Sequence, residues 1–83
     1  MITKKKLATL KEQLIVAMDD CERTRSEANW FSGYRAAKGY PYPDHEKHYQ
    51  RELEWWKKYE ICLDIRKKTL AAYVRAVRAF AMQ

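Results

Sequence analysis

The residues best suited to chemistry lie where the first half of the chain gives way to the second. His45, His48 and Glu52 follow Asp44 at spacings of three and four residues, which would place them on one helical face. Imidazole and carboxylate groups so arranged can hold a divalent cation. No HExxH pair or third soft ligand accompanies them, and histidines in the first turns of an exposed helix are usually solvated. We therefore expect no metal and no cofactor.

The two cysteines, Cys21 and Cys62, form no CxxC pair, so the sequence indicates neither zinc nor redox chemistry. If the chain folds back on itself they come close together. A disulfide between them stays open, although in a reducing compartment we expect two small buried hydrophobic side chains. The sequence also lacks a nucleophile beside a base, a phosphate-binding loop and paired carboxylates, so we expect no enzymatic activity.

Aromatic and basic side chains interleave between residues 30 and 49. Aromatic residues and arginine dominate the energetics of protein interfaces, because they bury large areas. The predicted partner-binding residues are Trp30, Tyr34, Arg35, Tyr40, Tyr42 and, further along, Trp55. Two alternatives stay open: the tyrosines could simply pack the loop against the helices, or the rings could stack on unpaired bases.

Positive charge collects at both ends of the chain. Residues 1 to 11 hold four lysines and no acid, residues 66 to 83 hold five basic residues and no acid, and residues 12 to 65 hold eight basic and eleven acidic residues. This pattern favours either a solvated, dipole-complementing helix end or a surface for phosphates or an acidic protein. A nucleic-acid surface would use Lys4, Lys5, Lys6, Lys11, Lys67, Lys68, Arg75 and Arg78. These cations spread around the second helix, so base-specific reading is not expected.

Two apolar stripes of period 3.5 predict the elements that carry these residues. The first stripe contains Leu7, Leu10, Leu14, Ala17, Cys21, Thr24, Ala28, Phe31 and Arg35, and the second contains Glu52, Trp56, Tyr59, Leu63, Arg66, Leu70, Tyr73, Val77 and Phe80. Setting Leu7 opposite Phe80 brings Arg35 opposite Glu52. The sequence thus predicts an all-α fold, a long antiparallel, coiled-coil-like helical hairpin. It forms a single domain over residues 1–83, with helices over about 3–38 and 44–81 and a turn over 39–44.

Local signals support these bounds. Thr3 and Asp44 can cap the two helix starts, and Gly39 can end the first helix. Ser32-Gly33 is the weak point, where the first helix could kink or stop. Arg66, at a seam position, is expected to lay its stem over the seam and send its charge outward.

The hairpin seam does not absorb every apolar group. A further stripe on the second helix contains Trp55, Cys62, Ile65, Thr69, Ala72 and Ala76. Exposed apolar patches of this size mark interaction surfaces, so we expect a homodimer that forms a four-helix bundle. A first helix split into two shorter ones, or a different partner protein, would also cover the stripe.

The predicted function is a non-enzymatic interaction module: a small helical adaptor or inhibitor that docks on a larger protein complex and modulates it. Small, basic, tryptophan-rich proteins of this kind are frequent among phage-encoded inhibitors. The alternative is a nucleic-acid-binding accessory protein. No apolar run approaches membrane-spanning length, and charged residues interrupt the stretch after the basic start, so we expect a cytoplasmic protein without a membrane partner.

Overall fold

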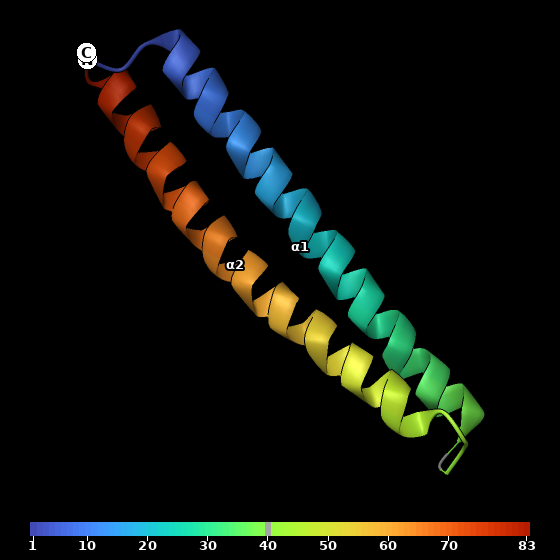
Figure 1. Cartoon of the computed structure of the whole chain (residues 1–83). Helices are drawn as coiled ribbons and strands as arrows, with labels where there is room; N and C mark the ends of the chain where they lie inside the picture. The colour runs from blue at the N-terminus through green and yellow to red at the C-terminus, as the bar shows by residue number, and fades with distance from the viewer. Residues whose placement is uncertain (40) are drawn as a thin grey trace.

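The computed structural model describes residues 1–39 and 41–83, so Tyr40 lies outside the described residues. Helix α1 spans Lys4–Lys38 and helix α2 spans His45–Ala81. The two helices run side by side in opposite directions, with both chain ends at one end and the turn at the other (Figure 1). The hairpin measures 62 × 14 × 13 Å. The predicted all-α antiparallel hairpin is confirmed.

Helix α1 begins and ends at the residues whose chemistry suits a helix terminus. The Thr3 hydroxyl accepts a hydrogen bond from the Lys6 backbone N–H at 3.1 Å, which satisfies one donor of the first turn. Gly39 follows the last turn with a φ of 73°, a conformation that glycine adopts without a Cβ penalty, and its N–H donates to the Arg35 carbonyl.

Helix α2 begins after Asp44, as predicted, but the Asp44 side chain makes no capping hydrogen bond. The backbone closes this first turn instead. The His45 N–H donates to the Tyr42 carbonyl and the His48 N–H donates to the Asp44 carbonyl, at 3.1 and 3.0 Å.

Helix α1 is continuous through Ser32 and Gly33, so the break that the sequence left open is absent. A glycine costs a helix only about 1 kcal/mol relative to alanine. Buried Phe31 before it and paired Arg35 after it hold this stretch against α2 and offset that cost. The alternative of two shorter helices packed around the second helix is therefore wrong.

The core of the hairpin is a narrow seam. On α1 every buried residue belongs to the predicted stripe: Ala17, Cys21, Thr24, Ala28 and Phe31. The Thr24 hydroxyl is satisfied by the Asp20 and Cys21 carbonyls. The small side chains at the first four of these positions allow the two helices to approach closely.

On α2 the seam departs from the prediction toward the C-terminus. Leu70 and Val77, predicted to face α1, are 48% and 39% exposed, whereas Ala76 is buried and Thr69 is half-buried. The two arrangements differ by one residue, and the apolar pattern fits both. Thr69 faces α1 in place of Leu70, and Ala76 in place of Val77. Close helix packing leaves no room for the larger side chain of each pair. Part of the stripe assigned to the outside thus lies in the seam.

Across the described residues, neither helix contains a stretch long and apolar enough to cross a membrane.

Candidate functional site

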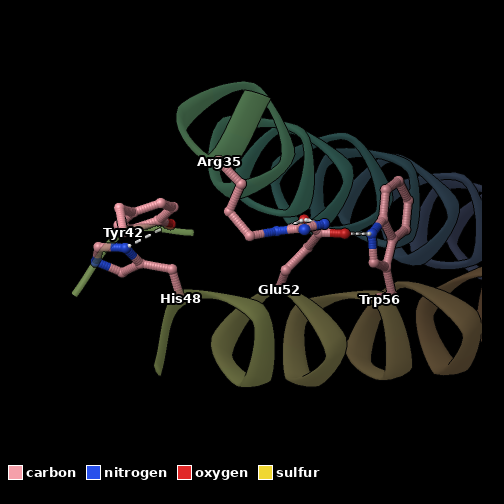
Figure 2. Close-up of polar contacts among 5 residues, drawn as sticks. All are labelled: Arg35, Tyr42, His48, Glu52 and Trp56. Carbon is pink, nitrogen blue, oxygen red and sulfur yellow. Dashed lines mark hydrogen bonds and ion pairs between the residues drawn. The ribbon is translucent and has the colours of Figure 1, made fainter. Parts of the chain in front are cut away.

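A buried ion pair locks the tip of the hairpin. The Arg35 Nε and Nη2 atoms donate to Glu52 Oε1 at 3.0 and 2.7 Å, and the Trp56 indole N–H donates to Glu52 Oε2 at 3.1 Å (Figure 2). The Glu52 side chain is only 9% exposed, and both its oxygens are satisfied. The buried negative charge of Glu52 is tolerated because Arg35 and Trp56 satisfy both of its oxygens. These hydrogen bonds form in only one register of the two helices.

Beside this pair, Tyr42 from the turn packs onto α2. Its hydroxyl lies 3.1 Å from His48 Nδ1 (Figure 2). Its ring centroid lies 5.3 Å from that of His45. Desolvation, followed by the nearby Tyr34, raises the pKa of the Tyr42 hydroxyl above its ordinary value. The hydroxyl therefore keeps its proton at neutral pH and can donate it to His48 when Nδ1 is unprotonated.

Trp30 projects from α1 next to this cluster. Its side chain is 57% exposed, yet two rings fix its position. Tyr34 stacks on it with centroids 5.3 Å apart, and Phe31 meets it edge-on at 4.8 Å. Tyr34 in turn contacts the edge of the His48 ring at 4.8 Å. The rings thus form one connected set from α1 across to α2.

Cations border these rings. The Arg35 guanidinium carbon lies 4.9 Å from the Tyr49 ring centroid, and Lys38 Nζ lies 5.5 Å from that of Tyr34. A shallow groove lined by Ser32, Arg35, Ala36, Gly39 and His45 lies at the same end of the molecule. The tip therefore combines exposed aromatic surface, fixed geometry and positive charge.

The structure brings four of the six predicted partner-binding residues into this tip: Trp30, Tyr34, Arg35 and Tyr42. The prediction for Tyr40 lies outside the described residues. Trp55 lies apart from the others, half-buried on the side of the hairpin, with Lys58 Nζ 4.4 Å from its ring.

Sequence reasoning missed the parts that Trp56 and His48 play in this site. The spacing of four residues between Glu52 and Trp56 places them one above the other on a helix, a signal that the carboxylate could accept the indole N–H. Nothing comparable pointed to the contact between Tyr42 and His48, because that contact depends on the path of the turn.

Two of the residues considered as metal ligands, His48 and Glu52, contact other side chains. Glu52 accepts from Arg35 and Trp56, and His48 lies against Tyr42. Within residues 1–39 and 41–83, no three histidine, cysteine or acidic side chains form a group that could hold a metal ion.

Both cysteines are free thiols. Cys21 is 2% exposed, and this burial raises its pKa, against the opposing effect of the Arg66 charge. A neutral, buried thiol behaves as a small hydrophobic side chain. Arg66 itself is exposed, so its charge lies outside the seam.

The predicted nucleic-acid-binding cations fall into two groups. The Ile2 N–H donates to Gln83 Oε1 at 2.6 Å, and Gln83 Nε2 donates to the Ile2 carbonyl at 2.9 Å. These bonds tie the chain ends together, so Lys4, Lys5, Lys6, Lys11, Arg75 and Arg78 lie in the half of the hairpin near the open end. Lys67 and Lys68 lie near mid-length instead, and Lys68 pairs with Asp64 at 2.9 Å.

Comparison with known proteins gives no match to a family model, to a curated protein or to a solved structure.

Proposed function

We propose that this hairpin is a non-enzymatic interaction module that docks through its tip on a larger protein and modulates it, as an adaptor or inhibitor. The observation that carries the proposal is Trp30, which is 57% exposed and still held on two sides by Phe31 and Tyr34. An exposed tryptophan already fixed in place loses little conformational entropy on binding.

The surroundings of Trp30 suit a protein partner. Interface hot spots are rich in Trp, Tyr and Arg, and the tip presents all three within one set of contacts. The ion pair between Arg35 and Glu52 and the stop at Gly39 keep α1, the turn and α2 in one arrangement. Docking on such a surface requires little rearrangement, which favours affinity.

We also propose that the hairpin acts as a homodimer that forms a four-helix bundle. Large apolar side chains remain exposed along the middle of both helices: Val16, Met18, Ile61, Ile65 and Leu70 are each between 48% and 61% exposed. A second copy would remove these side chains from water, a favourable change of about 25 cal/mol per Å² of apolar surface.

Affinity capture from the native cell tests the docking proposal. We expect a partner to be retained by the natural hairpin and lost with Trp30→Ala. Met82→Ala is the matched control, because it removes a large, 88% exposed apolar side chain at the opposite end. Retention of the same partner by Trp30→Ala would contradict the proposal.

A second candidate function is nucleic-acid binding at the open end. The two hydrogen bonds between Ile2 and Gln83 favour it, because they hold Lys4, Lys5 and Lys6 close to the last turns of α2. Clustered cations bind phosphates and release the counterions around them.

A further inference from the structure

Trp30 has the most exposed aromatic side chain of the described residues, with 57% of its surface open to water. Tyr34 stacks on one face of the indole with the ring planes 18° apart, and Phe31 meets its edge. Within residues 1–39 and 41–83 no further ring contacts the indole. One face of this ring is therefore free of the protein's own aromatic side chains.

Lysine and arginine side chains cover three other aromatic rings of the chain. Measured from the charged group to the ring centroid, these pairs are Lys58 with Trp55 at 4.4 Å, Lys38 with Tyr34 at 5.5 Å and Arg35 with Tyr49 at 4.9 Å. No lysine or arginine of the described residues lies over the Trp30 ring. Because tryptophan binds cations better than tyrosine or phenylalanine does, the open face of Trp30 is a strong cation-binding surface without a cation.

A carboxylate lies beside this open face. Glu27 precedes Trp30 by three residues, a spacing that makes the two side chains neighbours on the helix surface. Long side chains on a helix lean toward the preceding turn, so Tyr34 covers Trp30 from the C-terminal side. The open face of the indole is then turned toward the turn that holds Glu27.

Glu27 has no cation of its own chain. It is exposed, and it forms no ion pair with any described residue. Arg23, one turn earlier in α1, donates to Asp20 at 2.9 Å instead. A cation placed on the open face would meet both the negative face of the Trp30 ring and the Glu27 carboxylate.

These two groups suit a guanidinium better than an ammonium. A guanidinium is planar, so it can stack on an indole while its N–H groups, which lie in its own plane, donate to a carboxylate. An ammonium is more strongly hydrated and has no flat face. Arginine is also one of the residue types enriched at the hot spots of protein interfaces.

We propose that the open face of Trp30 and the carboxylate of Glu27 together bind an arginine side chain of the partner protein. The inference rests on the docking proposed above and adds the side chain that the partner supplies. The bound arginine extends along α1 the contacts that run from Lys38 to Tyr34 and from Tyr34 to Trp30.

Titration of the full chain with N-acetyl-arginine amide tests the site, with N-acetyl-citrulline amide as a neutral probe of the same shape. The indole N–H resonances in proton–nitrogen correlation spectra, recorded at constant ionic strength, report binding. We expect the arginine amide to shift the Trp30 resonance and to bind about fivefold more tightly than the citrulline amide. Trp55, which already carries Lys58, and Trp56, which donates to Glu52, are internal controls and should not shift.

The variant Glu27→Gln removes the carboxylate charge and keeps the shape of the side chain. We expect it to weaken binding of the arginine amide about threefold. Glu22→Gln is the matched control, because Glu22 is also an exposed acid of α1 without an ion pair but lines the groove beside Arg66. It should leave the dissociation constant unchanged. Circular dichroism reports the fold of each variant separately.

Equal dissociation constants for the two amides, or a lower one for N-acetyl-lysine amide, would overturn the assignment to arginine. An equal response of Trp55 would overturn the assignment to Trp30, and unchanged binding by Glu27→Gln would overturn the role of Glu27. None of these outcomes depends on the partner protein. A partner retained by Trp30→Ala would contradict the docking itself, even where the arginine amide binds.

Discussion

Arg35 and Glu52, seventeen residues apart in the chain, meet across the hairpin at 2.7 Å. The contact joins the last turns of α1 to the second turn of α2, and it sets which residues of the two helices lie at equal height. A shift of either helix by one residue would leave the Glu52 carboxylate buried without its partner. The pair therefore determines the geometry of the tip.

Removing one member of this pair should destabilise the hairpin. We expect Arg35→Met to lower the free energy of unfolding by about 1 to 3 kcal/mol, because it strands a buried carboxylate while Arg35 itself is partly exposed. The double variant Arg35→Met, Glu52→Leu should lose less. Urea denaturation followed by circular dichroism measures both. The control is Arg23→Met, which breaks an exposed pair with Asp20 and should cost less than about 1 kcal/mol. Equal losses for Arg35→Met and Arg23→Met would refute the role of the buried pair.

The two glycines should respond in opposite directions to alanine. Gly33 lies within α1, and a Cβ built there meets no atom within 4 Å, so Gly33→Ala should stabilise the hairpin by about 0.5 to 1 kcal/mol. Gly39 has a φ of 73°, and Gly39→Ala should cost about 1 to 3 kcal/mol. Thermal unfolding distinguishes them. A lower melting temperature for Gly33→Ala would indicate that α1 needs a flexible point at this position.

The buried thiol makes stability depend on alkaline pH. The pKa of Cys21 is raised in the folded chain by burial, so the folded state holds this proton more tightly than the unfolded state does. The stability that results is fully present below the ordinary pKa of 9.0 and is lost as the pH rises through the folded value. We expect Cys21→Ala to flatten this part of the profile, measured by urea denaturation between pH 8 and 11. An unchanged slope would assign the loss to other groups, such as Tyr42, whose pKa is also raised.

The second candidate function predicts a particular dependence on salt. If the open end binds nucleic acid, replacing Lys4, Lys5 and Lys6 with Gln should weaken binding and reduce the slope of log K against log salt by about 2 to 3. Lys47, Lys57 and Lys58 provide the control, since changing them to Gln removes the same charge elsewhere. Fluorescence anisotropy with a labelled oligonucleotide measures both. Equal effects of the two triple variants would remove the open end as the binding site.

Much of the fold follows from the sequence because long helices depend on local patterns. The seven-residue repeat placed Arg35 opposite Glu52, and the structure confirms that register. Thr3 was identifiable as a helix start because its hydroxyl can accept a hydrogen bond from the first turn. Gly39 was identifiable as a helix end because glycine, without a Cβ, adopts a positive φ readily. The sequence left a break at Gly33 open, and α1 continues through it because a local helix propensity near 1 kcal/mol is smaller than the contribution of the packing around it.

The remaining features depend on packing that the repeat does not encode. Ala76 and Val77 are adjacent and both apolar, so the sequence cannot tell which one faces α1. Lys67 and Lys68 were grouped with the basic ends, but the register places them near mid-length. The sequence predicted that Tyr42 lies at the tip. It did not predict the contact of Tyr42 with His48, because that contact depends on the path of the turn.

The central claim is that the tip docks on a protein through Trp30, and the binding affinity of the captured partner tests it most directly. Isothermal titration calorimetry with the purified partner would compare the natural hairpin with Trp30→Ala and Met82→Ala. We predict that Trp30→Ala raises the dissociation constant about 30-fold or more, as loss of a hot-spot residue does, without loss of helicity. Met82→Ala should change it less than about twofold. An unchanged dissociation constant for Trp30→Ala would contradict the account.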